Sequence, residues 1–251
     1  SINIEILLRT FFFYISYLLY FFILSAVSIF FSAYMKEASS SLSILISLWI
    51  VWTIFFPNIA LSSIDKLYSL PSRNQFKSQM SNDRAEGIDG HNPNDERSKK
   101  LEEKVLSKYN VSNLSDLPIN FDGVRMQADE EYGNKVWDKH FGNINQILLN
   151  QKKLYQLFGI LNPFISLKNI SMGLASSDNF HHQDFVVKAE LYRRNFIKRL
   201  NDEHAYGGSK TGDWSWTPDK NFYKSISEFK YKILPINVVF KNNLTDFIMI
   251  I

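Results

Sequence analysis

Two uncharged stretches decide the fold: TFFFYISYLLYFFILSAVSIFFSA at residues 10–33 and ASSSLSILISLWIVWTIFFPNIALSSI at residues 38–64. Neither contains Asp, Glu, Lys or Arg. At about 1.5 Å per residue, each is long enough as a helix to cross a hydrocarbon core about 30 Å thick. The sequence therefore predicts two membrane helices, joined into a hairpin by a short polar connection at residues 34–37.

The front of the chain and the remainder differ in composition. The first 64 residues carry charge only at Glu5, Arg9, Lys36 and Glu37, whereas the 251 residues together have 28 Lys and Arg and 25 Asp and Glu. The net charge is +3, and basic residues alternate with acidic ones, so no basic stripe is present for nucleic acid to bind. Since the sequence has no cysteine, disulfides, thiolate metal sites and cysteine nucleophiles are excluded.

These compositions divide the chain into three predicted segments. Residues 1–64 form the membrane helix hairpin, residues 65–243 form an outer domain, and residues 244–251 form the start of a third membrane helix. The apolar end FIMII stops abruptly, and the first stretch lacks the cleavage site of a signal peptide. Both ends are therefore interpreted as cuts through a longer protein.

The outer domain is predicted to be a bundle of long helices, which makes the fold class all-α. Apolar side chains recur at helical spacing over residues 123–161 and again over residues 178–203. Two long helices with matching apolar stripes are expected to pair as an antiparallel hairpin. The stripes consist of Trp137, Phe141, Ile144, Leu148, Tyr155 and Phe158 in the first helix, and of Phe185, Ala189, Tyr192, Phe196 and Leu200 in the second.

Shorter helices are expected beside this pair. Ser72 is suited to cap a helix that begins near residue 73, and Asp95 or Asn94 is suited to cap another of roughly a dozen residues. Residues 221–229 are typical of a last short helix. No stretch has a convincing strand pattern.

Residues 163–177, PFISLKNISMGLASS, connect the two long helices and allow two interpretations. The first is a short helix that caps the hairpin. The second is a helix lying on the membrane surface with its apolar side chains dipped into the bilayer. The side chains that would enter the bilayer are Phe164, Ile165, Leu167, Ile170 and Met172.

No residue is predicted to be catalytic or to bind a cofactor or metal. The glycine-rich phosphate loop, the GxSxG elbow and the HExxH pair are missing, so the chain is not expected to be an enzyme. His181 and His182 point about 100° apart on a helix, whereas Asp178 and His182, at i,i+4, could bind one ion together. Solvation and capping of a helix start is the favoured interpretation, and a metal-dependent membrane hydrolase using His181 or His182 is an alternative.

Two further polar groups receive structural interpretations. His140 lies beside the first apolar stripe and is expected to pack against the partner helix. Asp129, Glu130 and Glu131 are expected in the first turns of the long helix, where the helix dipole favours acidic residues without any catalytic role.

The chain resembles a known family in several ordered motifs. The phenylalanine-rich first helix, the loop with Lys36, and the second helix ending in Pro57 resemble the fourth and fifth membrane helices of ABC-2-type exporter permeases. Five further segments resemble the large extracytoplasmic helical domain of unknown function that a bacterial subgroup of these permeases carries. They are SLPSRNQF (69–76), GHNP (90–93), LPINFDGVRMQADEEYGNKVWDKHF (117–141), LNPFISLKNISMGLASSDNFHHQDF (161–185) and AELYRRNFIKRLN (189–201).

This resemblance implies a topology and a set of partners. The complete permease would have six membrane helices, of which this chain holds two and the start of a third. Residues 34–41, with Lys36 and Glu37, would face the cytoplasm near a separate ATP-binding cassette ATPase subunit, and residues 65 to about 243 would lie outside the bacterial inner membrane. A second permease copy or a homologous permease would complete the pathway in the lipid bilayer. ATP would be hydrolysed by the partner, and this chain would carry no cofactor.

Within such a pathway, the second helix is the candidate for the inward face. Its small hydroxyl residues Ser43, Ser47 and Thr53 allow close helix approach and are predicted to lie near the pathway. The expected function is therefore that of a permease subunit of an ABC exporter. The alternative is a membrane-anchored interaction or sensor protein, whose outer helices bind a periplasmic partner and which transports nothing.

Overall fold

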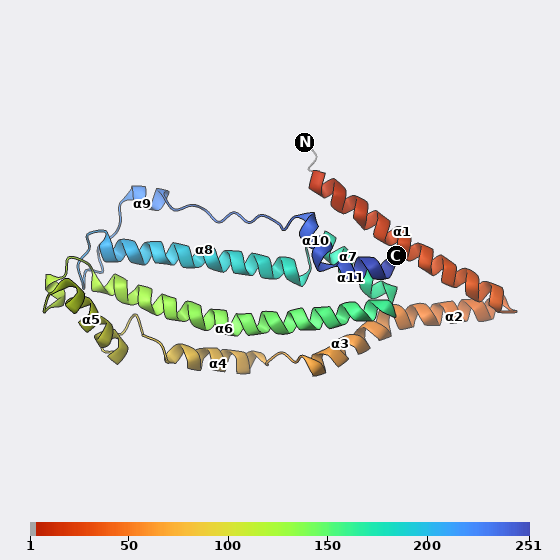
Figure 1. The fold of residues 1–251 in the computed structure, drawn as a ribbon, viewed down its shortest axis with the longest axis horizontal. Coiled ribbons are helices and arrows are strands. Elements are labelled where there is room, and N and C mark those ends of the chain that lie inside the picture. Colours follow the sequence, from red (N-terminus) through yellow and green to blue (C-terminus); the bar gives the residue numbers. More distant parts are fainter. Residues whose placement is uncertain (1–3) are drawn as a thin grey trace. The chain divides into compact units, whose positions relative to one another are not determined.

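A computed structural model describes residues 4–251, and all regular structure in this range is helical (Figure 1). The all-α prediction is confirmed for these residues; residues 1–3 of the predicted hairpin segment lie outside the described range. The chain forms two compact units. The first contains the residues up to 70 together with 145–185 and 232–251, and the second contains 71–144 and 186–231. The predicted outer segment 65–243 is thus divided between the two units.

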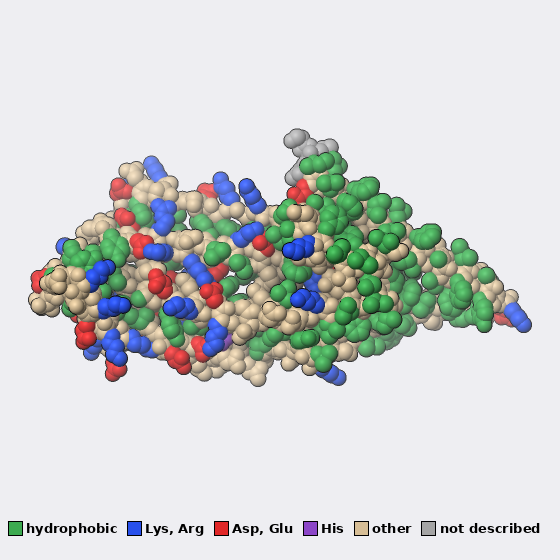
Figure 2. Space-filling model, in the orientation of Figure 1, with side chains coloured by type: hydrophobic (Ala, Val, Ile, Leu, Met, Phe, Trp, Pro, Cys, Tyr) green, Lys and Arg blue, Asp and Glu red, His purple; other side chains and the backbone are tan. Residues whose placement is uncertain are grey.

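Two helices of the first unit are long and apolar enough to cross a membrane. They are α1 (Ile4–Tyr34) and the continuous helix Ala38–Leu67, which consists of α2 (Ala38–Ile50), a π-helical turn at Val51–Phe55 and α3 (Phe56–Leu67). Only 11% of the most apolar window of each helix is buried, whereas a core helix of a soluble protein is mostly buried. Hydrophobic side chains cover the visible surface of α1 and α2 (Figure 2). These features suggest association with a membrane.

The π-helical turn ends two residues before Pro57. Proline has no N–H for the carbonyl of Thr53, and its ring crowds that carbonyl, so the helix widens here instead of ending. Asn162, which is fully buried, donates a hydrogen bond of 2.7 Å from Nδ2 to the carbonyl of Trp52 in the same turn. A side chain from the core therefore satisfies a backbone group in the widened turn.

Seven serine and threonine hydroxyl groups in the two candidate spans are satisfied within their own helices. Each donates to the backbone carbonyl four residues earlier, as hydroxyls commonly do inside helices. Such bonds allow a hydroxyl to face lipid or a neighbouring helix without an unpaired donor. The residues are Thr10, Ser16, Ser28, Ser43, Ser47, Thr53 and Ser63.

The core of the first unit is built around α7 (Pro163–Leu174). Asn162 caps this helix by accepting a hydrogen bond from the Phe164 N–H, and seven of the twelve residues are buried. It packs against α1 and α11 (Leu244–Ile250), with α10 (Ile236–Asn242) also in contact. The membrane-surface interpretation of residues 163–177 is therefore wrong for Ile165, Leu167 and Ile170, which are core side chains.

Charged and polar side chains hold α1 to this core. Arg9 donates from Nη1 to the carbonyl of Leu174 (2.9 Å) and from Nη2 to the carbonyl of Leu234 (2.6 Å). A cation at the C-terminus of α7 is favourable because the last carbonyls of a helix have no partner within it. Arg9 thus links the start of α1 to the end of α7.

The second unit begins with two capped helices. In α4 (Arg73–Ala85), Ser72 and Gln75 form a reciprocal capping box, and Asp95 caps α5 (Glu96–Tyr109). Both predicted caps are confirmed. The predicted helix at 221–229 is shorter than expected, because α9 comprises only Lys220–Lys224. After it, the carbonyls of Ser225 and Ser227 accept hydrogen bonds from side chains of the helix Asn179–Tyr206.

Within the second unit, α6 (Phe121–Leu157) and α8 (Asn179–Tyr206) run antiparallel, as predicted. Residues early in α6 contact residues near the end of α8, and residues further along α6 contact earlier residues of α8. The contacting pairs are Gly123 with Ala205, Gln127 with Asn201, Glu130 with Arg193 and Asp138 with Arg194.

The acidic residues of α6 have a different role from the one predicted. The helix begins at Phe121, so Asp129 and Glu130 lie beyond its first turns. Asp129 pairs with Arg84 of α4, and Glu130 pairs with Arg193 of α8. Ion pairs between helices, rather than the helix dipole, account for these two side chains.

The close approach of α6 and α8 at Gly123 predicts an effect on stability. A Cβ at this position would lie 2.5 Å from the backbone nitrogen of Ala205, and backbone cannot yield as a flexible side chain can. We expect Gly123→Ala to lower the free energy of unfolding by about 1–3 kcal/mol, measured by chemical unfolding followed by tryptophan fluorescence.

Gly142→Ala in the same helix is the matched control. No atom lies within 4 Å of the added Cβ, so alanine should stabilise the helix by up to about 1 kcal/mol. Equal effects of the two substitutions would contradict the close-contact explanation.

Candidate functional site

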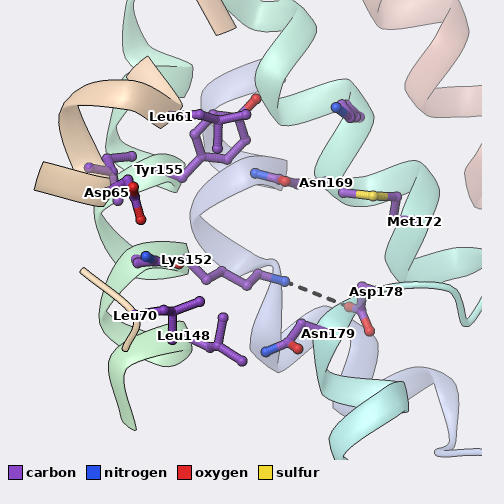
Figure 3. Close-up of a pocket in the computed structure, with 13 residues that line it drawn as sticks. Leu61, Asp65, Leu70, Leu148, Lys152, Tyr155, Asn169, Met172, Asp178 and Asn179 are labelled. Atoms are coloured by element: carbon purple, nitrogen blue, oxygen red, sulfur yellow. Dashed lines mark ion pairs between the residues drawn. The ribbon is translucent and has the colours of Figure 1, made fainter. Parts of the chain in front are cut away.

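A cavity of about 490 Å³ lies in the first unit, beside the end of the second candidate span. Leu61, Ile64 and Asp65 of α3 line it together with residues from α6, α7 and the start of α8. Figure 3 shows Lys152 reaching from α6 toward Asp178, which precedes α8. Most of the wall is apolar, contributed by Leu61, Ile64, Leu70, Leu148, Tyr155 and Met172. The cavity therefore combines an apolar wall with one buried charged pair.

The charged pair is held from both sides. Lys152 Nζ lies 3.6 Å from Asp178 Oδ2 and donates to Asn243 Oδ1 at 2.9 Å, while the ring of Phe180 lies 4.4 Å from the ammonium. Asp178 Oδ1 accepts hydrogen bonds from the backbone N–H of His181 (3.0 Å) and lies 2.6 Å from its Nδ1. Both side chains are mostly buried, with 13% of Lys152 and 4% of Asp178 exposed.

A second buried carboxylate lies near this pair. Asp246 of α11 is fully buried and accepts hydrogen bonds from Asn169 Nδ2 of α7 (2.8 Å) and Gln156 Nε2 of α6 (2.6 Å). Gln156 also donates to the carbonyl of Asn242. Three helices are thus joined through one carboxylate, and one member of this network, Asn169, lines the cavity.

Burial and charge shift the titration of the pair. Burial lowers the pKa of the Lys152 ammonium, although the charges of Asp178 and Asp246 oppose this shift. Burial alone would raise the pKa of Asp178, but the backbone and ring hydrogen bonds of His181 and the charge of Lys152 outweigh it, so the pKa lies below its ordinary value. The carboxylate is therefore ionised at neutral pH.

The arrangement can bind and orient a polar group, and it contains no assembled nucleophile and base. Among the described residues, no group of three or more His, Asp or Glu side chains is placed to hold a metal ion. The site offers a carboxylate oxygen, an ammonium and amide groups beside an apolar wall. Such a combination is typical of a binding site for a small molecule with an apolar body.

The favoured prediction of a capped helix start is confirmed at Asp178, whereas the local geometry corrects the pairing of Asp178 with His182 and the packing of His140. Asp178 precedes the first residue of α8, so its carboxylate reaches the third helical residue, His181, rather than His182 at i,i+4. His182 is exposed. His140 is buried, but it packs on α4, with Nε2 2.8 Å from Asp83 Oδ2, and not on the partner long helix.

The predicted pathway residues lie apart from the cavity. Ser43 and Ser47 are exposed on α2, and Thr53 is half-buried in the π-helical turn. Each hydroxyl bonds to its own helix backbone. Lys36 and Glu37 are exposed in the connection between α1 and α2, as the hairpin prediction requires. Of the residues that line the cavity, the sequence analysis considered a functional role only for Asp178, as a metal ligand with His182, and it did not favour that interpretation.

Two features of the sequence could have indicated the buried network. Asp246 is the one charged residue among the apolar side chains of residues 244–251, and an isolated charge in such a segment is commonly functional or paired. Lys152 is a charged residue between Leu148 and Tyr155, two members of the apolar stripe of α6. Their partners, at Asn169, Asp178 and Asn243, are distant in sequence and have no pattern that identifies them.

Comparison with known proteins gives one family. Residues 73–232 match the model of a family described as a domain of unknown function (DUF3526). The match lies within the predicted outer segment 65–243 and includes neither candidate span. No curated protein and no solved structure matches the chain.

The lowered pKa of Asp178 predicts a pH dependence of stability. Below the ordinary value of 3.8, the unfolded chain binds a proton that the folded chain does not. The stability contributed by Asp178 is therefore complete above about pH 4 and is lost as the pH falls through the lowered pKa.

Asp178→Asn should lower the free energy of unfolding at pH 7 by about 1–3 kcal/mol and flatten its decline between about pH 4 and pH 2. Urea unfolding at a series of pH values measures both effects. Parallel pH profiles of the two proteins would show that Asp178 does not carry this linkage.

Proposed function

We propose that this chain, which belongs to the DUF3526 family, forms part of the membrane-spanning subunit of an ABC exporter. A separate ATP-binding cassette subunit would bind and hydrolyse ATP. Its cycle would rock two copies of the permease, or this permease and a homologous one, between inward-open and outward-open states. The chain itself would perform no chemistry and would need no cofactor.

The cavity at the end of the second candidate span carries this proposal. A helix that only anchors a protein need not contribute to a binding site. Here Leu61, Ile64 and Asp65 of the same continuous helix line a cavity opposite Lys152 and Asp178. Movement of that helix would change the cavity, and such a connection suits a transport pathway.

The exposed faces of the candidate spans also support the proposal. Large apolar side chains such as Phe22, Ile29 and Trp49 are more than half exposed, which a bilayer or further membrane helices would cover. The family match falls on the segment whose motifs resemble the outer domain of ABC-2-type permeases. The proposed location is the bacterial inner membrane, as a multi-pass subunit with residues 65 to about 243 on the extracytoplasmic side and Lys36 and Glu37 in the cytoplasm.

The alternative function is that of a membrane-anchored periplasmic interaction or sensor protein. It is favoured by the number of charged side chains on the surface of the second unit, where a partner protein would bind (Figure 2). A neighbouring reading frame that encodes an ATPase with Walker motifs supports the exporter. The absence of such a frame favours the anchor.

Cysteine accessibility tests the pathway. The sequence has no cysteine, so Ser43→Cys, Ser47→Cys and Thr53→Cys each introduce a single thiol. We expect a water-soluble maleimide to label these positions at rates that change by roughly tenfold between nucleotide states of the complete transporter, because access to water alternates.

Ser28→Cys is the matched control. Its hydroxyl bonds to its own backbone in the same way, but it lies on α1, and its labelling should not depend on nucleotide. If all three thiols on the second helix remain unreactive in every nucleotide state, the pathway does not run along this face.

Reporter fusions test the topology. Fusions after Glu37 and after Asn110, which follows α5, should report opposite sides of the membrane, with Glu37 in the cytoplasm. Alkaline phosphatase and a fluorescent protein, which are active on opposite sides, give complementary readouts. Equal signals at the two positions would overturn the proposed arrangement of both spans.

A further inference from the structure

Lys152 and Asp178 line the cavity, and the pair has unused hydrogen-bonding capacity. Oδ1 of Asp178 is held by His181, whereas Oδ2 accepts no hydrogen bond from any described residue, although it is buried. The 3.6 Å between Oδ2 and Lys152 Nζ is longer than a normal hydrogen bond. A buried carboxylate oxygen without a donor is costly, so this position favours a ligand that supplies one.

Lys152 supplies the complementary group. An ammonium has three N–H donors, and here one of them bonds to Asn243 Oδ1. Figure 3 shows the Lys152 side chain extended across the cavity with its nitrogen directed at Asp178. A donor and an acceptor therefore lie side by side at one end of a largely apolar space.

We propose that the cavity binds an apolar alcohol, whose hydroxyl donates to Asp178 Oδ2 and accepts from Lys152 Nζ. A hydroxyl is the smallest group that does both at one oxygen. An oxygen about 2.8 Å from each atom fits across a 3.6 Å separation. That the protein transports this alcohol rests on the proposed function. That the cavity binds the alcohol does not depend on the proposed function.

Charge and shape exclude the nearest alternatives. A ligand amine would place a second cation beside Lys152, and a ligand carboxylate would place a second anion beside Asp178, each at an electrostatic cost in a buried site. An ether accepts a hydrogen bond but cannot donate one. The remainder of the ligand would contact Leu61, Leu148 and Met172, and the cavity volume of about 490 Å³ is typical of small-molecule sites.

A matched ligand pair tests the proposal on the wild-type protein. The probes are 4-phenylbutan-1-ol and its methyl ether, which have nearly the same apolar body but differ in the O–H donor. Binding is measured by calorimetry on the full-length protein in lipid nanodiscs, with protein-free nanodiscs as the reference for partition into lipid. We expect the alcohol to bind at least about tenfold more tightly than the ether. Equal affinities would overturn the proposal.

Two variants locate the binding. Asp178→Asn and Lys152→Met should each reduce the preference for the alcohol over the ether to less than about threefold, because each removes one partner of the hydroxyl. Asp219→Asn is the matched control, since Asp219 also caps a helix but lies in the second unit, and it should retain the full preference. A preference that survives both cavity substitutions would place the alcohol elsewhere and contradict the proposal.

The natural alcohol has two sources, a membrane lipid with a free hydroxyl or a molecule from the water phase. Analysis of the lipids extracted from the purified wild-type protein and from Asp178→Asn distinguishes the two sources. A lipid alcohol that only the wild type retains identifies the membrane as the source. If neither sample retains one while the probe preference holds, the source is the water phase. Binding is measured without the ATPase, so a failure of transport with intact binding would overturn the proposed function alone.

Discussion

The first unit depends on the burial of one carboxylate, that of Asp246. Removing a carboxylate from water is costly, so burial raises the pKa of Asp246, and donors around the carboxylate oppose that shift. The donors are Asn169 on α7 and Gln156 on α6, so α6, α7 and α11 must assemble together. Lys152 is added to the same assembly through Asn243, at the junction of α10 and α11. The position of the cavity follows from this requirement.

The second candidate span is joined to that core by polar groups as well as by apolar packing. Pro57 disturbs the backbone bonds of the preceding turn, and Asn162 bonds to one of the carbonyls there. Asn162 also caps α7, so one buried amide is shared by the span and the core helix. Apolar contacts of Ala60 and Ile64 with Tyr155 and Ile165 continue the junction toward the cavity. A displacement of the span would therefore reach α7 and α6 directly.

The parts of the fold that were predictable have local causes. Uncharged stretches long enough to cross a bilayer indicated α1 and the helix Ala38–Leu67, and the residue types at Ser72 and Asp95 indicated two caps. Periodic apolar residues indicated α6 and α8. In each case neighbouring residues carry the information, because helices form through contacts three and four residues apart.

The candidate site was not predictable, because the residues that form it are distant from one another in the sequence. Gln156 and Asp246 are separated by 90 positions, and Lys152 and Asn243 by 91, so no local pattern joins them. Burial of α7 was left undecided, because its apolar residues suit a membrane surface as well as a protein core, and the packing of α1 and α11 against it decides between the two. The i,i+4 spacing of Asp178 and His182 was misleading, since a residue before the first turn does not follow helical geometry.

The π-helical turn at Val51–Phe55 has a consequence for the alignment of the span's two halves. Such a turn holds about one residue more than an α-helical turn, which rotates everything after it by about 100° relative to an uninterrupted α-helix. One extra residue in this turn therefore determines how the hydroxyl face of α2 is rotated relative to the cavity-lining face of α3. Deleting a single residue within the turn would leave both halves helical while turning Leu61 and Ile64 away from the cavity. The length of this turn thus determines which residues of α3 face the cavity.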